Sequence, residues 1–112
     1  MALTRSSVGS WKSATTYGTG IYTTTAFTPP HNSLLVVCVA IGTNGGVVDP
    51  SGSLTITDSA SLTWTSRVAI GAAASWAIGH RVFTAPVTTG VSMTLTVDCG
   101  SVNAYMYLVQ AV

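Results

Sequence analysis

Apolar and polar residues alternate in short stretches along this chain, and a period of two is typical of a β-strand that buries one face. Residues 91–98 show the alternation most clearly. Residues 33–41 are almost all apolar, which predicts a central strand covered on both faces. In total the pattern predicts about seven strands, at residues 20–27, 33–41, 54–57, 62–70, 75–85, 91–97 and 102–112.

The stretch 62–70 carries a specific expectation about which side chains enter the core. Its large apolar residues all have even numbers, so an unbroken strand would place them together on the buried face. These residues are Leu62, Trp64, Val68 and Ile70. The stretch is therefore predicted to be half-buried from end to end.

Turn-forming residues separate the expected strands. They include Pro29-Pro30-His31-Asn32, Asn44-Gly45-Gly46 and Pro86–Gly90. Short strands divided in this way predict an all-β fold, an antiparallel β-sandwich of the immunoglobulin-like or jelly-roll kind, over residues 20–112. Residues 1–19 do not alternate and are expected to form an extended N-terminal arm.

The composition narrows the possible functions. The chain has 112 residues, 47% hydrophobic and only 6% charged, against about 25% charged in an ordinary soluble domain. A net charge of +1 is too small for a nucleic-acid binder, which needs many cations to neutralise phosphates. We therefore expect no nucleic-acid partner.

The apolar runs indicate where the protein is made. No apolar run follows the first basic residue, so a secretory signal peptide is not expected. The longest run, Leu34–Ile41, is too short for a membrane span of about 20 residues. A surface rich in Ser, Thr and Gly is nevertheless typical of extracellular β-proteins. Virion proteins, synthesised in the host cytoplasm and later exposed outside, satisfy both conditions, so the expected location is a virion.

Two segments are predicted to contact other subunits. The arm cannot bury enough apolar surface to order itself, and its Trp11 is the expected anchor on a neighbour. In the last strand Tyr105 and Tyr107 lie on one face, and apolar residues occupy the other. Because one face can enter the core, the other needs a neighbouring subunit or further chain. We therefore expect partners among other copies of the chain and other virion proteins.

The cysteines and histidines do not predict a metal or a cofactor. Cys38 lies in the most apolar strand, and we expect both it and Cys99 to be reduced, as is usual for cytosolic synthesis. His80 is in phase with apolar neighbours and is expected to face the interior or an interface, while His31 follows two prolines. A metal site would need three or four converging ligands.

Catalysis is not expected either. A glycosidase needs two carboxylates flanking the scissile bond, but Asp49 and Asp58 lie in or beside turns, where Asp favours hydrogen bonds to the local backbone. Asp98 is at a strand end. No nucleophile elbow of the G-x-S-x-G type is present. The chain is therefore predicted not to be an enzyme.

The aromatic residues leave carbohydrate binding open as an alternative. Aromatic faces can stack on sugars, and Trp76, which follows a loop of small residues, is the best candidate for exposure. Trp64 alternates with core residues, so its burial is expected instead. Surface glycans are thus a second class of partner to consider.

Four segments resemble a β-sandwich domain that recurs in phage tail and fibre proteins and in some bacterial surface proteins. They are NSLLVVCVAIG, LTITDSASLTWTSRVAI, HRVFTAPVTTGVSMTLTVDCG and YMYLVQAV, within residues 20–112. The resemblance implies a scaffold without catalytic residues. Relatives of this kind usually continue past the last strand, so the chain is expected to be covered or extended there.

Together these features predict a structural component of a phage virion that acts by subunit–subunit assembly. A tail-associated role, as a minor tail protein or fibre base, is the leading expectation. The alternatives are a capsid decoration protein and a carbohydrate-binding module. The residues expected at interfaces are Trp11, Trp76, Tyr105 and Tyr107.

Overall fold

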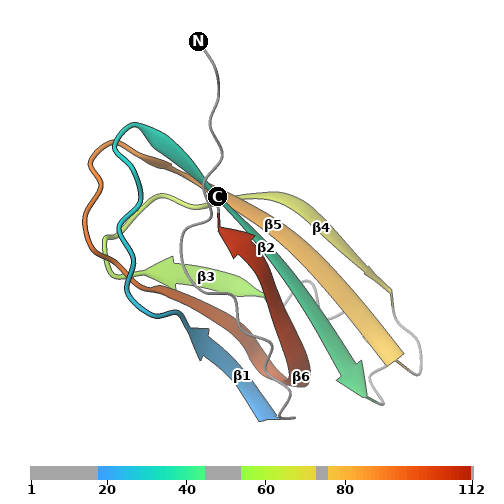
Figure 1. Ribbon diagram of the computed structural model, residues 1–112. Helices are drawn as coiled ribbons and strands as arrows, with labels where there is room; N and C mark the ends of the chain where they lie inside the picture. The colour runs from blue at the N-terminus through green and yellow to red at the C-terminus, as the bar shows by residue number, and fades with distance from the viewer. Residues whose placement is uncertain (1–17, 45–53, 73–75, 112) are drawn as a thin grey trace.

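The computed structural model describes residues 18–44, 54–72 and 76–111, with side-chain positions for residues 21–41, 54–71 and 79–98 (Figure 1). Every regular element in these ranges is a strand, which confirms the all-β prediction. The strands are β1 (Gly18–Thr23), β2 (Ser33–Asn44), β3 (Thr55–Asp58), β4 (Thr65–Ala72), β5 (Trp76–Val87) and β6 (Leu95–Ala111).

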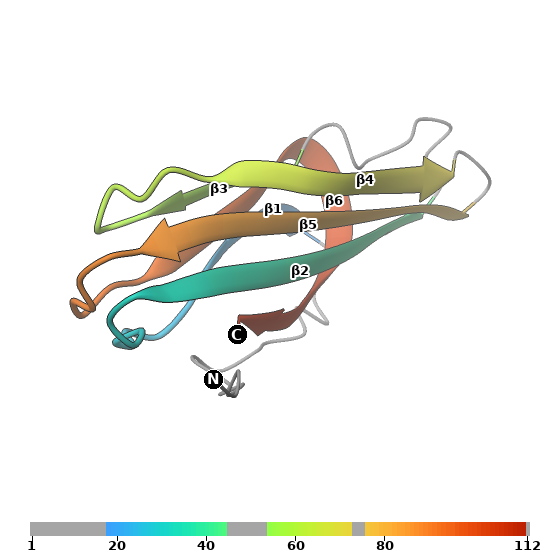
Figure 2. The ribbon, with the colours of Figure 1, turned by 90° about the horizontal axis from the view of Figure 1, so that it is seen from above.

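The strands form two antiparallel sheets that share β6. In one sheet β5 lies between β4 and β2, and the end of β6 pairs with the other side of β2. In the second sheet the first part of β6 lies between β1 and β3. Figure 2 shows β4, β5 and β2 side by side, with β6 curving from one layer into the other. This arrangement is consistent with a β-sandwich.

The single strand β6 replaces two expected strands. The pattern predicts separate strands at 91–97 and 102–112, but residues 95–111 form one strand of 17 residues. Its first part pairs with β1 and β3, and residues 105–111 pair with β2. Ahead of it, Met93 makes an isolated bridge with Phe27. The division into an arm at 1–19 and a domain at 20–112 stays a prediction, since residues 1–17 lie outside the described ranges.

The core lies between the two sheets. β2 and β5 supply alternate residues from their inner faces, and β6 supplies them from the opposite layer, as an antiparallel sandwich requires. The buried set is Leu35, Val37, Val39, Ile41, Leu54, Phe83, Val87, Met93, Leu95 and Val97. Burying each of these side chains contributes roughly 1.5–3 kcal/mol relative to exposure.

Two loops close one end of the molecule against each other. Gly90 lies so close to the Pro29 carbonyl oxygen that a Cβ at position 90 would clash with it. Nearby, the Asn32 amide donates to the Thr88 carbonyl at 3.3 Å, with Asn32 in the left-handed region at a φ of 51°. Asparagine tolerates that conformation better than most residues. The turn expected at residues 29–32 is therefore confirmed.

Candidate assembly surface

β2 alternates between buried and partly exposed residues. Its odd-numbered residues from Leu35 to Ile41 are buried, while Val36, Cys38 and Ala40 are half-buried and Leu34 is 52% exposed. The expectation that this strand is covered on both faces is wrong. The second sheet packs against the inner face alone, so the outer face keeps its apolar residues in partial contact with solvent.

A β-bulge in β4 exposes two more apolar residues. Ser66 pairs with Phe83 of β5 and Val68 with Val82, so Arg67 is an extra residue without an opposite position. One extra residue reverses the faces of everything that follows it in the strand. Val68 and Ile70 consequently lie on the outer face, where they are 40% and 62% exposed.

The bulge corrects the prediction that residues 62–70 bury one continuous face. Leu62 and Trp64 pack against the core as expected, but they precede the bulge. Val68 and Ile70 follow it and lie beside Val82 and His80, on the outer side of the sheet.

Arg67 holds the bulge by a hydrogen bond to the neighbouring strand. Its Nε donates to Thr84 Oγ1 at 2.8 Å, and Thr84 is only 8% exposed. A buried hydroxyl without a partner would be destabilising, so this contact satisfies Thr84. The same hydrogen bond holds the Arg67 side chain against the β4–β5–β2 sheet.

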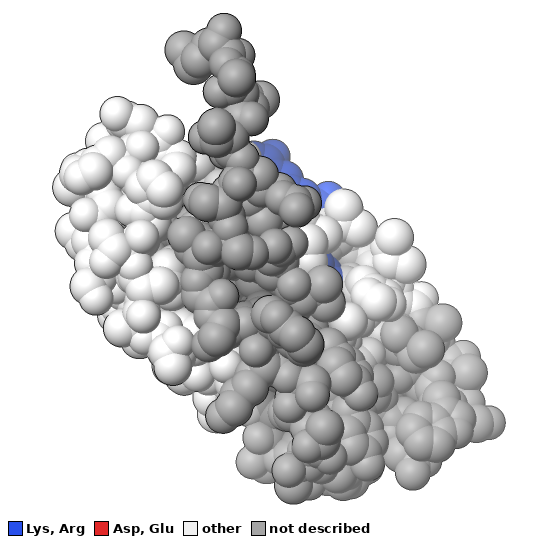
Figure 3. Space-filling model, in the orientation of Figure 1, with Lys and Arg blue, Asp and Glu red and all other residues white. Residues whose placement is uncertain are grey.

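The strand register therefore defines an outer face over β4, β5 and β2 that is mainly apolar. Its described members are Leu34, Val36, Cys38, Ala40, Thr65, Val68, Ile70, His80, Val82, Thr84 and Pro86, and Arg67 reaches onto it through its hydrogen bond to Thr84. On the side of the molecule drawn in Figure 3, the described surface is mostly white, the colour of all uncharged residues, with two blue patches and no acidic red visible. Contiguous exposed apolar surface on a small protein commonly marks a contact with another protein.

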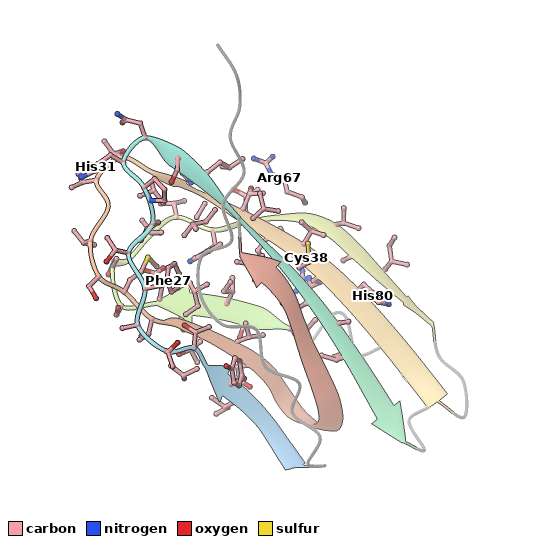
Figure 4. The ribbon with its side chains drawn as sticks, in the orientation of Figure 1. Phe27, His31, Cys38, Arg67 and His80 are labelled. Atoms are coloured by element: carbon pink, nitrogen blue, oxygen red, sulfur yellow. The ribbon has the colours of Figure 1, made fainter. Side chains whose placement is uncertain are left out.

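The two histidines and Cys38 lie in different surroundings. His80 is exposed on the outer face, so its expected interior position is wrong, while the predicted interface position remains open. His31 lies in the loops at the far end and accepts a hydrogen bond from the Gly90 amide at 3.4 Å. Cys38 is a free thiol, half-buried on the outer face and not enclosed as expected. Figure 4 labels these residues and shows His31 apart from the other two.

No group of three or more metal-ligating side chains occurs among the described residues. The Cys99 side chain lies outside them.

Asp58 organises the turn between β3 and β4. Its carboxylate accepts hydrogen bonds from the Ala60 amide at 2.7 Å and from the Leu62 amide at 3.1 Å. It also accepts from Trp64 Nε1 at 2.7 Å. The "T-D-S" and "L-T-W" elements of the sequence are thus joined by one structural network. Asp58 has a local structural role here, as its turn position predicted, and Trp64 packs against the core.

Buried polar groups elsewhere also serve the fold. Arg81 Nη1 donates to the Leu54 carbonyl at 2.6 Å, and its guanidinium lies 5.3 Å from the Phe83 ring centroid. The Arg81 Nε is buried without a hydrogen-bond partner in the described part of the chain.

Burial raises the pKa of the Tyr22 hydroxyl above its ordinary value of 10.0.

The four residues expected at interfaces fall largely outside the described side chains. Trp11 lies outside the described residues altogether, and of Trp76, Tyr105 and Tyr107 only the backbone is described. The register pairs Trp76 with Asn44 and Tyr105 with Gly42.

Tyr107 pairs with Ala40, which pairs with His80, which pairs with Ile70. The position of Tyr107 therefore continues a row that crosses the outer-face sheet. Periodicity could not indicate this relation, because it depends on strand order and on the bulge.

The chain has no match among protein-family models, curated proteins or solved structures. The resemblance to phage tail and fibre domains therefore stays a prediction. No helix in the described ranges is long and apolar enough to cross a membrane.

Proposed function

We propose that this chain is a structural subunit of a phage virion, associated with the tail, and that it acts by packing against other subunits. The sandwich would be of the immunoglobulin-like or jelly-roll kind, and the phage setting rests on the sequence resemblance. The observation that carries the assembly role is the outer face of β4, β5 and β2. Leu34, Val68 and Ile70 are 52%, 40% and 62% exposed there.

The size of this face supports a protein contact. β2 and β5 have 12 residues each and β4 has 8. With about 3.3 Å per residue and about 4.8 Å between strands, these three strands present roughly 500 Å² of sheet. The end of β6 extends the same sheet beyond β2. A standard interface buries about 800 Å² on each partner, so this face is of the right order.

Charge supports the same role. The described members of the outer face include no carboxylate. Charged residues are generally depleted from the centre of protein interfaces. Carbohydrate binding gains no support from Trp64, because its indole packs on the core and donates to Asp58. Trp76 remains the aromatic on which that alternative would depend.

The test is made on particles of the phage that encodes the chain. We expect peptides of the chain in purified particles by mass spectrometry, and antibody-labelled gold at the tail by electron microscopy. Labelling over the capsid would instead identify a decoration protein. Absence from purified particles, despite expression in infected cells, would overturn the proposal.

A matched pair of variants tests the surface. Leu34→Glu places a charge on the outer face, and we expect it to reduce incorporation into particles. Ile21→Glu is the control, since Ile21 is 65% exposed on β1, in the other sheet. If both variants are incorporated like the wild type, the outer face is not the assembly surface.

A further inference from the structure

Strand β4 is exposed along its whole described length. Every residue from Thr65 to Gly71 is exposed, and among the described strands only β5 pairs with β4. Within the described part of the chain, its second edge therefore presents backbone N–H and C=O groups without a strand partner. Such an edge is a template for pairing with another strand.

This edge has only part of the usual protection against pairing. Proteins commonly protect edge strands by keeping them short, by adding lysine, proline or inward-pointing charge, or by a β-bulge. The bulge of β4 lies at Arg67, and Val68–Ala72 after it pair with β5 without a further shift. β4 has eight residues, TSRVAIGA, with no lysine or proline. Its one charged residue, Arg67, is held by Thr84 of the neighbouring strand. The other sheet has shorter edge strands, β3 with four residues and β1 with six.

The sequence of β4 is self-complementary about Ala69. An antiparallel pair of identical strands centred there places Val68 of one copy opposite Ile70 of the other, twice. Two-fold interfaces require this kind of self-complementarity, and cross-strand pairs of β-branched residues stabilise sheets. Each copy would thereby cover the two exposed apolar residues that the bulge turns outward.

The charges permit this pairing. With Ala69 at the centre, Arg67 lies opposite Gly71 of the second copy. The two arginines are then four residues apart along the strands, about 13 Å. That separation exceeds the Debye length of about 8 Å at physiological ionic strength. Ala69 pairs with Arg81 on the inner side.

We propose that β4 pairs antiparallel with β4 of a second copy of this chain, centred on Ala69, so that the β4–β5–β2 sheets of two copies form one continuous sheet. This inference rests on the proposed assembly function and specifies its first partner. The joined sheet would also unite the two outer faces into one larger apolar surface.

Cysteine cross-linking tests the register. In the full chain with Cys38→Ser and Cys99→Ser, the added substitution Ala69→Cys puts the two new thiols directly opposite each other. Opposite Cα atoms in antiparallel strands are about 4.5–5.5 Å apart, within the range of a disulfide. We expect a covalent dimer under mild oxidation. Thr65→Cys is the matched control and should not cross-link, because the two positions would be about 26 Å apart.

A charge on the edge provides a second readout. Ile70→Lys should raise the dissociation constant of the dimer more than about tenfold in analytical ultracentrifugation, whereas Ile21→Lys should leave it unchanged. Circular dichroism establishes that both variants are folded. The inference is overturned if Ala69→Cys does not cross-link, or if Thr65→Cys cross-links equally.

The cross-linking experiment and the particle experiment can fail independently of each other. If the chain is present in particles but Ala69→Cys does not cross-link, the pairing is wrong and the virion role stands. If Ala69→Cys cross-links but the chain is absent from particles, the pairing stands and the virion role is wrong.

Discussion

Replacing Asp58 by alanine should be among the most damaging substitutions outside the core. The carboxylate accepts from the Ala60 and Leu62 amides and from Trp64 Nε1. Asp58→Ala leaves all three donors without this acceptor. Leu62 and Trp64 both pack against the core, so the loss reaches beyond the turn.

The magnitude follows from the number and kind of these hydrogen bonds. A hydrogen bond to a charged group contributes about 1.5–3 kcal/mol, and a neutral one about 0.5–1.5 kcal/mol. Asp58 is half-buried, so water can replace part of what is lost. We expect Asp58→Ala to lower the free energy of unfolding by about 3 kcal/mol, a large part of the roughly 5–15 kcal/mol typical of a domain.

Two further substitutions separate the contributions of the individual hydrogen bonds to the stabilisation by Asp58. Asp58→Asn keeps one acceptor oxygen but replaces the other with a donor, so it should cost about 1–2 kcal/mol. Trp64→Phe removes the Nε1 donor and retains an aromatic ring. In a double-mutant cycle with Asp58→Ala, we expect a coupling energy of about 1 kcal/mol between the two side chains.

The assay is urea unfolding of the full chain, followed by circular dichroism so that Trp64→Phe can be measured in the same way. Thr63→Ala is the control, since Thr63 is exposed in the same turn and should change stability by less than about 0.5 kcal/mol. If Asp58→Ala also falls within about 0.5 kcal/mol of the wild type, the carboxylate network does not stabilise the turn and the reasoning is refuted.

Three further predictions concern other parts of the fold. Gly90→Ala should lower the free energy of unfolding by about 1–3 kcal/mol in urea, because the new Cβ meets the Pro29 carbonyl oxygen. Arg67→Ala should cost about 1 kcal/mol by leaving the Thr84 hydroxyl unpaired, and Thr84→Val, which removes that hydroxyl, should cost less in the same assay. The folded chain keeps the Tyr22 proton to higher pH than the unfolded chain, because burial raises the pKa of Tyr22. Stability should therefore be complete below about pH 10 and fall as pH rises through the folded-state pKa, and urea midpoints against pH should lose this dependence in Tyr22→Phe.

The core could be predicted from alternation because the strands that form it keep their period. Met93, Leu95 and Val97 are buried at the parity that the sequence indicates. Alternation alone could not show that the second sheet packs against only the inner face of β2, leaving its outer face half-buried or exposed. An all-apolar stretch is compatible with burial on two faces and with burial on one face beside an interface.

The bulge explains why the pattern fails in β4. Counting by twos from Leu62 and Trp64 leads to Val68 and Ile70, and the sequence between them has no glycine or proline to signal an interruption. The extra residue is apparent only from the pairing with β5, where Thr84 accepts from Arg67 and Val82 lies opposite Val68. The pairing of β4 with β5, and not local propensity, decides which face of the sheet carries Val68 and Ile70.

Asp58 and Arg67 together determine what this part of the chain presents to its surroundings. Asp58 fixes the turn so that Leu62 and Trp64 pack inward, and Arg67 then shifts the register so that Val68 and Ile70 face outward. Both charged side chains are engaged in contacts within the chain. A sequence with only 6% charged residues uses two of them to set the geometry of one strand, which leaves the outer face apolar and the edge of β4 open. Under the proposed assembly role, Asp58 and Arg67 would thus place Val68 and Ile70 where another subunit could contact them.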